Sequence, residues 1–290
     1  MSDAPLTFVH LTDLHIGNPA VEDDHLYSDT ATTLRRVLAE VKTMAPAPRF
    51  IVASGDLTNQ GDAGSYEQLK AIMAEAELDI PVLFTLGNHD KRTGFYPVML
   101  GRTEDLDKPY DHAQVIGGIH IILIDTSAPF KIGGHFEPGQ IEWLTAELDR
   151  HPELPKLIVM HHAPALDQRP ELEWESLSIA DTEQLRTALA GRNVLGILSG
   201  HIHFDRVSNW YGIPVVVGIG QHAATDVLYL QEGLRMVSGA SFAVGTVRPS
   251  GLTVSFVPQP SDRRELKLYT FAGMAELVKG YEAAAALAAE

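Results

Sequence analysis

Residues 6–15 read LTFVHLTDLH, an apolar run that ends in the polar sequence Thr12-Asp13-Leu14-His15. Short runs rich in Val, Ile, Leu and Phe are typical of buried strands. Five more such runs follow at 50–53, 82–86, 119–124, 157–160 and 195–198. Between the runs, the sequence predicts amphipathic helices over 29–44, 65–78, 138–150 and 181–190. This alternation of strands and helices predicts a layered α/β fold with a largely parallel sheet.

The pattern changes after residue 203. Short β-rich runs, separated by Gly, Pro and Ser, follow at 206–211, 214–219, 241–247 and 252–257. They predict an antiparallel continuation, either as a second sheet or at one edge of the first. The alanine-rich tail at 272–290 predicts a helix that caps the domain or contacts another copy of the chain. We therefore expect one domain over 1–260 and a helical C-terminal extension over 261–290.

Five of the six apolar runs are followed by side chains that bind metals. These blocks are Thr12-Asp13-Leu14-His15, Ser54-Gly55-Asp56, Gly87-Asn88-His89-Asp90, His161-His162 and Gly200-His201-Ile202-His203. Because the carboxyl ends of parallel strands meet at one edge of an α/β sheet, we expect these side chains to lie close together.

Two spacings add detail to this expectation. Asp13 and His15 are two residues apart, and in extended backbone such a pair points to one side and holds a shared centre. The same argument applies to the histidines at 201 and 203. A glycine precedes the candidate ligands at 56, 88 and 201, and glycine permits an unusual turn and a close approach of the backbone.

The chain has no cysteine and 13 histidines, so any metal must be held by His, Asp, Glu or Asn. Such ligands suit divalent Mn, Fe, Zn or Co. The blocks contain seven candidate ligands, which are Asp13, His15, Asp56, Asn88, His161, His201 and His203. Seven are too many for one ion that keeps a position open for substrate, so we expect two ions that share a bridging carboxylate. This arrangement suits hydrolysis of a phosphate ester. His89 is next to Asn88 and could contact the phosphoryl oxygen or protonate the leaving oxygen.

Charge restricts the substrate. With 38 acidic and 22 basic side chains, the formal net charge of −16 argues against binding to long nucleic acid or to an anionic membrane. No apolar stretch approaches the ~18 residues of a membrane span, and the first residues lack the features of a signal peptide. We therefore expect a cytoplasmic protein that acts on a small phosphate ester.

The ordered blocks resemble the pattern D-x-H…G-D…G-N-H-[DE]…H…G-H-x-H of the calcineurin-like metallophosphoesterase superfamily. The longer segments GDLTNQG (55–61), GNHDKR (87–92), HHAP (161–164) and VSFVP (254–258) are more similar to class III cyclic-nucleotide and glycerophosphodiester-type phosphodiesterases. This resemblance implies a four-layer α/β/β/α sandwich with mixed sheets. It also implies that Asp13, His15, Asp56 and His203 hold one metal, and that Asp56, Asn88, His161 and His201 hold the other. His89 takes the place of the catalytic histidine of the family.

The resemblance thus implies a dinuclear metal-dependent phosphodiesterase, which cleaves a cyclic nucleotide, a glycerophosphodiester or a similar small substrate by metal-activated hydroxide with assistance from His89. The alternatives are a phosphomonoesterase and a metal-binding regulatory module without catalysis. The sequence 57–61 and Asp90 depart from the serine/threonine protein phosphatases of the superfamily and argue against that substrate. Contact of Arg92 or His222 with substrate, and self-association of the chain, are left open.

Overall fold

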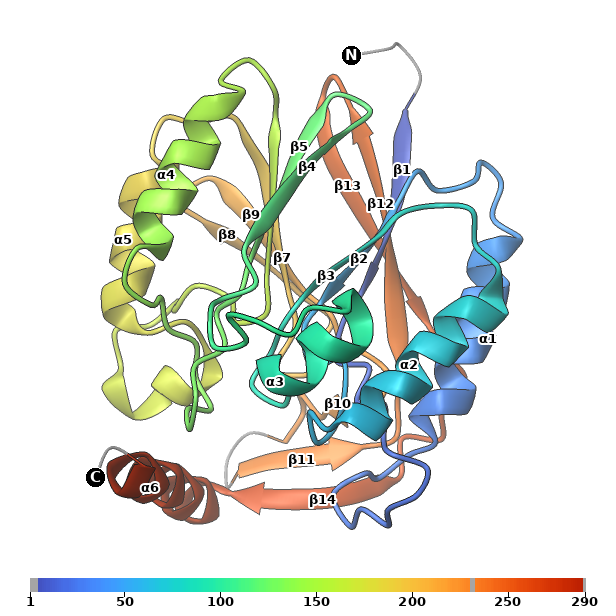
Figure 1. Cartoon of the computed structure of the whole chain (residues 1–290), viewed down its shortest axis with the longest axis vertical. Coiled ribbons are helices and arrows are strands. Elements are labelled where there is room, and N and C mark those ends of the chain that lie inside the picture. Colours follow the sequence, from blue (N-terminus) through green and yellow to red (C-terminus); the bar gives the residue numbers. More distant parts are fainter. Residues whose placement is uncertain (1–4, 230–232, 289–290) are drawn as a thin grey trace.

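The protein is described by a computed structural model that covers residues 5–229 and 233–288. Two mixed sheets pack face to face, and helices cover both outer faces (Figure 1). The first sheet has the strand order β13-β12-β1-β2-β3, and the second has the order β4-β5-β6-β7-β9-β8. This four-layer α/β/β/α sandwich confirms the predicted fold class.

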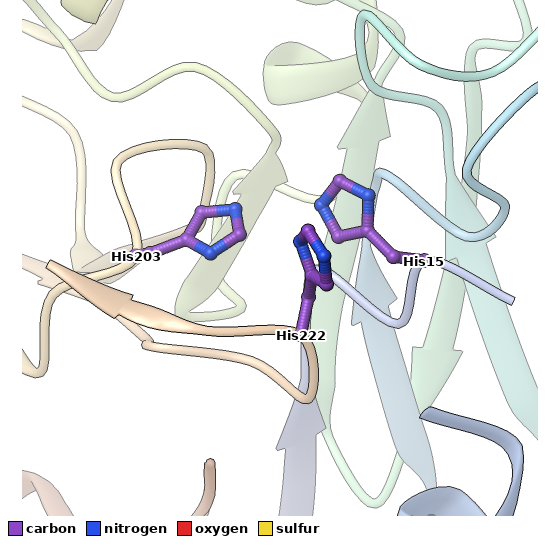
Figure 2. Close-up of side chains that lie close together, drawn as sticks. All are labelled: His15, His203 and His222. Carbon is purple, nitrogen blue, oxygen red and sulfur yellow. The ribbon is translucent and has the colours of Figure 1, made fainter. Parts of the chain in front are cut away.

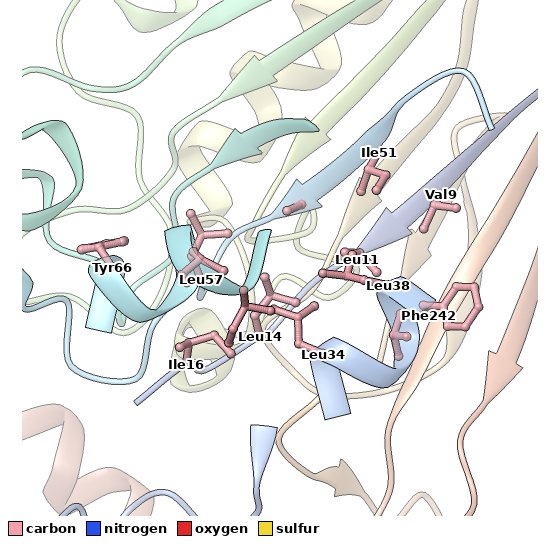
Figure 3. Packing of buried hydrophobic residues seen from close by; sticks show 14 of the residues in the cluster. Val9, Leu11, Leu14, Ile16, Leu34, Leu38, Ile51, Leu57, Tyr66 and Phe242 are labelled. Carbon is pink, nitrogen blue, oxygen red and sulfur yellow. The ribbon is translucent and has the colours of Figure 1, made fainter. Parts of the chain in front are cut away.

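The first sheet contains the first three predicted strands. Parallel β1 (Leu6–Leu11), β2 (Ile51–Ser54) and β3 (Val82–Thr85) are extended by antiparallel β12 (Ser241–Arg248) and β13 (Gly251–Pro258). Its outer face is covered by α1 (Thr30–Lys42) and α2 (Ala63–Ala76). Asp29 caps α1 by accepting the N–H of Thr32 at 3.0 Å. The apolar stripe of α1 packs on β1 and β2 and includes Leu34 and Leu38 (Figure 3).

The second sheet contains the other three predicted strands. Parallel β5 (Ile119–Ile124), β6 (Lys156–Met160), β7 (Val194–Ser199) and β9 (Ile213–Val217) are flanked by antiparallel β4 (His112–Ile116) and β8 (Arg206–Trp210). Its outer face is covered by α4 (Gln140–Arg150) and α5 (Ile179–Leu189). A third apolar cluster fills the space between the sheets, where the rings of Phe8 and Phe50 stack at 5.1 Å.

The prediction of an antiparallel continuation after residue 203 is wrong in part. β9 pairs with β7 in parallel, and β12 and β13 return to the first sheet. The valines of β9 at 215–217 are all buried, which is typical of a strand within a parallel sheet. Three short helical elements lie earlier in the chain: α3 (Arg92–Phe95), the π-helix η1 (Tyr96–Leu100) and the 3₁₀ helix η2 (Pro170–Glu175).

A small third sheet lies below the sandwich in Figure 1. It has the order β10-β11-β14, formed by β10 (Ala224–Thr225), β11 (Gly233–Val237) and β14 (Glu265–Thr270). The tail forms α6 (Phe271–Ala288). The expected extension therefore begins with a strand that pairs with β11, and only then becomes helical. The first four residues of the expected domain and the last two of the tail lie outside the described residues. Among the described helices, we find none long and apolar enough to cross a membrane.

Candidate metal centre

The predicted ligands meet at one end of the sandwich, although they come from both sheets. β1, β2 and β3 of the first sheet end just before Asp13, Asp56 and Asn88. β6 and β7 of the second sheet end just before His161 and His201. The carboxyl ends of five parallel strands therefore bring together side chains that are far apart in the sequence.

Asp56 lies in the middle of this cluster. Its Oδ2 atom is 3.2 Å from Nε2 of His161 and 3.6 Å from Nε2 of His15. On the His15 side, Oδ1 of Asp13 is 3.3 Å from Nε2 of His203. One carboxylate is thus shared by two groups of imidazoles, as a bridging ligand between two ions requires.

The backbone at these ligands is not extended, so the reasoning from alternation along a strand is wrong. Five of them have left-handed φ angles, which are 47° at Asp13, 43° at His15, 47° at Asp56, 77° at His201 and 53° at His203. Non-glycine residues adopt this region rarely, and such conformations gather at functional sites. The ring of His201 lies 5.2 Å from that of His161, whereas the ring of His203 lies 5.2 Å from that of His15. The two histidines of the H-x-H block therefore face different groups.

The glycines before the ligands act as predicted, mainly through close approach. Gly55 has a φ of 97° and a β-carbon there would be 2.6 Å from Nδ1 of His161. At Gly87, a β-carbon would be 2.3 Å from Oδ1 of Asp56. Since β-carbons do not approach other atoms so closely, only glycine lets these strand ends pack against the ligands of neighbouring strands.

Each candidate histidine ligand is oriented by a hydrogen bond on its far nitrogen. These bonds join Nδ1 of His161 to the Ser54 carbonyl at 2.8 Å, Nδ1 of His203 to the Ala223 carbonyl at 2.9 Å, Nε2 of His201 to the Trp174 carbonyl at 2.7 Å, and Nδ1 of His15 to Oδ1 of Asn59 at 2.8 Å. Because the acceptor oxygens take the ring protons, the other nitrogen of each neutral ring keeps its lone pair for a metal.

Charges inside the cluster shift the pKa values strongly. Burial raises the pKa of Asp56, but the imidazoles of His161 and His89 outweigh it and hold that pKa well below its usual range. Burial lowers the pKa of His161, but the Asp56 carboxylate outweighs it and raises the pKa to about 9. Burial, reinforced by His161, lowers the pKa of His201 to about 4. The carboxylate is therefore ionised and attracts cations.

Three buried polar atoms of the cluster have no hydrogen-bond partner among the described residues. They are Nε2 of His15, Oδ1 of Asn88 and Nε2 of His161. Leaving a buried donor or acceptor unsatisfied costs about 1–3 kcal/mol. Nε2 of His15 and Oδ1 of Asn88 offer lone pairs, and Nε2 of His161 offers one once a cation displaces the proton that Asp56 stabilises there. Bound divalent ions would satisfy all three atoms. The residues present therefore fit a divalent metal centre.

His89 lies beside this centre. Its backbone N–H donates to Oδ1 of Asp56 at 2.9 Å, and its Nδ1–H donates to the Asn59 carbonyl at 2.9 Å. The ring lies 4.7 Å from that of His15. Sequence reasoning missed Asn59, which orients both histidines. The only signal for it was a polar side chain three residues after Asp56.

Two other polar residues near the cluster have their groups engaged elsewhere. The two nitrogens of His162 bond Oγ1 of Thr126 at 2.8 Å and the Ile132 carbonyl at 3.0 Å. Arg92 donates to Oδ2 of Asp125 at 2.8 Å and to the Ser127 carbonyl at 2.9 Å. Both residues therefore hold the loops of the second sheet against the centre.

An α/β/β/α sandwich with buried carboxylates and imidazoles at its strand ends is suited to metal-dependent hydrolysis of phosphoric esters. Residues 6–205 match the family model of the calcineurin-like phosphoesterases, and the chain belongs to this family.

Named relatives agree with this assignment, and a solved structure shares the fold. The chain is 33% identical to a probable cyclic nucleotide phosphodiesterase of Rhodococcus erythropolis over 77% of this chain and 71% of that protein. It is 29% identical to a cAMP/cGMP dual specificity phosphodiesterase of Mycobacterium tuberculosis, over 80% of this chain and 72% of that one. A dimetal phosphatase from Danio rerio shares the fold with a TM-score of 0.62 and 15% identity, over 87% of this chain and 98% of that chain.

Proposed function

We propose that this protein hydrolyses a small phosphodiester of the cyclic-nucleotide class at a centre of two divalent ions. The observation that carries the proposal is the set of buried, unpartnered lone-pair atoms around the shared carboxylate of Asp56. The names of the relatives favour a diester over a monoester, and one further relative, from Arcobacter nitrofigilis, is a probable glycerophosphodiester phosphodiesterase. A cytoplasmic location and self-association of the chain stay predictions.

In the proposed centre, seven side chains hold the ions. One ion is held by Asp13, His15, Asp56 and His203, and the other by Asp56, Asn88, His161 and His201. Mn, Fe, Zn and Co all suit these ligands. Bound ions supply positive charge for the phosphoryl oxygens and lower the pKa of water. The acidic chain thereby acquires a local site for an anion.

His89 supplies the proton chemistry of the proposed reaction. Hydrolysis forms a P–O bond with the oxygen of water and breaks one ester P–O bond, so the leaving oxygen must take up a proton. The Asn59 carbonyl holds the Nδ1 proton of His89. A protonated ring therefore presents its second proton on Nε2, where it can pass to the leaving oxygen.

A cavity of about 1230 Å³ is lined by Phe204, which directly follows the candidate ligand His203, and is proposed to take the organic part of the substrate. Its walls come from η2, the residues after His203 and the inner face of α6, and include Trp174, Phe204 and Met274. The carbonyl of Trp174 accepts the Nε2 proton of His201 at 2.7 Å, which joins the cavity wall to the centre. Trp174→Ala should raise KM for 3′,5′-cyclic AMP and leave turnover of bis(p-nitrophenyl) phosphate within twofold.

The test of the proposed function uses purified protein stripped by a chelator and reloaded separately with Mn, Fe, Zn or Co. Substrates are bis(p-nitrophenyl) phosphate, p-nitrophenyl phosphate and 3′,5′-cyclic AMP. We expect metal-dependent turnover of the two diesters and slower turnover of the monoester. Faster turnover of the monoester than of the diesters would favour the phosphomonoesterase alternative. No turnover of any substrate with any metal would contradict the proposal and favour a metal-binding regulatory module without catalysis.

Two variants separate the proposed roles. Asp56→Asn removes the shared charge and should abolish both metal binding and turnover. His89→Asn should keep the full metal content and lower kcat by about 10²–10³-fold, as loss of a general acid does. Loss of metal in the His89 variant would show that its role is wrongly assigned.

A further inference from the structure

His222 lies beside the proposed centre, in the segment between β9 and β10, and is 7% exposed. The centroid of its ring is 4.6 Å from that of His15 and 5.9 Å from that of His203. Figure 2 shows the ring rising toward the gap between these two imidazoles. One nitrogen of each ring lies within 4.8 Å of the others, so the three form a compact group. The question is whether His222 holds a metal or contacts the substrate.

The hydrogen bond on Nε2 answers this question. The backbone N–H of Tyr27 donates to Nε2 of His222 at 3.0 Å. A backbone amide has no acceptor at nitrogen, so Nε2 must carry the lone pair and the neutral ring must carry its proton on Nδ1. A protonated nitrogen cannot ligate a metal. The remaining nitrogen of His222 is therefore a hydrogen-bond donor. Among the hydrogen bonds of the described residues, none has Nδ1 of His222 as its donor.

Contacts from the chain segment before α1 hold this ring in place. The ring of Tyr27 stacks on that of His222 with centroids 5.2 Å apart and an interplanar angle of 14°. The hydroxyl of Ser28 donates to the His222 carbonyl. The hydroxyl of Tyr27 bonds that of Tyr269 in β14 at 2.5 Å. The C-terminal extension is thus linked to His222 through one intermediate side chain.

The backbone beside His222 is also tied to a candidate ligand. The N–H of Gln221 donates to the Asp13 carbonyl at 3.0 Å. Gly220 has a φ of 82°, and a β-carbon there would be 2.4 Å from Cβ of Asp13. Because glycine allows this approach, the segment stays fixed relative to the centre. A donor held so firmly needs no reorganisation when it meets a negative oxygen.

We propose that His222 is a further substrate-contacting residue, whose Nδ1–H donates a hydrogen bond to an oxygen of the phosphate group bound at the centre. Tyr269 acts as a positioning residue, because it holds Tyr27 and thereby the ring of His222. This inference rests on the proposed function for the identity of the bound group. Through Tyr269, strand β14 of the C-terminal extension helps to position a residue of the site.

The first experiment compares two variants of the manganese-loaded protein. His222→Phe keeps a ring for stacking but removes the donor, whereas His222→Gln keeps one acceptor for Tyr27 and one donor. We expect His222→Phe to keep its metal content, to lower kcat on bis(p-nitrophenyl) phosphate about 100-fold, and to weaken binding of inorganic phosphate about tenfold in calorimetry. His222→Gln should recover part of both losses. Loss of metal in either variant, or wild-type values in His222→Phe, would overturn the proposal.

The second experiment reads the tautomer directly. Nitrogen-15 spectra of the histidine side chains, recorded on metal-free and on zinc-loaded protein and assigned to His222 by its loss in His222→Phe, should show a protonated Nδ1 and an unprotonated Nε2 in both states. An unprotonated Nδ1 in the zinc-loaded protein would mean that His222 is a ligand. If the wild-type protein shows no turnover, the proposed function fails, while the tautomer and phosphate measurements still decide the role of His222.

The third experiment tests the link to β14. Tyr269→Phe removes one hydroxyl of the tyrosine pair and keeps its ring. We expect kcat to fall several-fold with little change in KM, and the His222 nitrogen signals to shift or broaden. The matched control is Tyr211→Phe, since Tyr211 is 71% exposed and lies in the turn between β8 and β9. Equal kcat and unchanged His222 signals in the Tyr269 variant would remove the positioning role.

Discussion

A β-carbon at Gly200 would lie 2.1 Å from Oδ2 of Asp13. The end of β7 in the second sheet therefore packs directly against a carboxylate that follows β1 in the first sheet. The same carboxylate accepts the backbone N–H of His201 at 3.1 Å. The two sheets meet at this point without room for any side chain, and the position of Asp13 depends on it.

Gly200→Ala should therefore disturb the proposed metal centre, although Gly200 is not itself a candidate ligand. The added methyl group must push Asp13 or the backbone of His201 aside, at a cost of about 1–3 kcal/mol for overpacking. We expect a lower melting temperature, a reduced metal content and at least a tenfold loss of turnover. Gly280→Ala in α6 is the control, because a β-carbon there meets no other atom within 4 Å. A Gly200 variant with full metal content would contradict this account.

The positions of the candidate ligands along the chain could be predicted because each follows an apolar run. A strand that is buried on both faces has a continuous apolar sequence, so it can be recognised from the sequence. Parallel strands then bring their carboxyl ends together. The division of the runs between two sheets could not be predicted from the residues, since the runs at 6–11 and 119–124 have the same apolar character. Only the resemblance to a family implied it.

The direction of each side chain was also beyond sequence reasoning. Alternation assumes extended backbone, whereas His201 and His203 adopt left-handed conformations that turn their rings apart. β14 was missed although its polar and apolar side chains alternate, because all of them are exposed or half-buried and none belongs to a buried apolar run. His222 could not be assigned because its role depends on a backbone N–H of Tyr27, which any residue there would supply.

Asp90 offers a test of how the two ligand loops are held together. Its Oδ2 accepts the N–H of Leu57 at 3.0 Å and that of Gly87 at 2.9 Å, and its Oδ1 accepts the hydroxyl of Tyr66 at 2.8 Å. Asp90→Asn would leave an amide group facing at least one buried donor. We expect it to lower the free energy of unfolding by about 2–4 kcal/mol, measured by urea denaturation.

Tyr66→Phe removes only one of these bonds and should cost about 1–2 kcal/mol. The two residues share one network, so the double variant should lose less than the sum of the single losses. Additive losses, or an Asp90 variant as stable as the wild type, would show that the carboxylate does not hold the loops.

Removal of metal should destabilise the folded protein. Binding to the folded state alone adds stability of RT ln(1 + [L]/Kd), which is about 2.7 kcal/mol at one hundred times Kd. We therefore expect a chelator to lower the melting temperature and manganese to restore it, with an effect that grows with metal concentration. Asp56→Asn should melt at the same temperature with and without metal. A chelator effect that persists in this variant would place the stabilising ion elsewhere.

The stability of the protein should also depend on pH through Asp111, which is not one of the candidate ligands. Burial, reinforced by Asp125 and opposed by hydrogen bonds and Arg92, raises the pKa of Asp111 from 3.8 to about 7. The folded state therefore binds a proton more readily than the unfolded state, and the free energy of unfolding falls as the pH rises through this window. The loss by pH 8 is on the order of a few kcal/mol, at about 1.4 kcal/mol for each pKa unit.

The variant Asp111→Asn tests this dependence. In the wild type, the N–H of Asp125 donates to Oδ1 of Asp111 at 2.9 Å, and the asparagine keeps such an acceptor without the charge. Asp111→Asn should be more stable than the wild type at pH 8 and little different at pH 4. The control Asp79→Asn, at an exposed position, should leave the stability unchanged at both pH values. Urea denaturation at both pH values measures the difference, and a gain that is equal at the two values would rule out the charge of Asp111 as its cause.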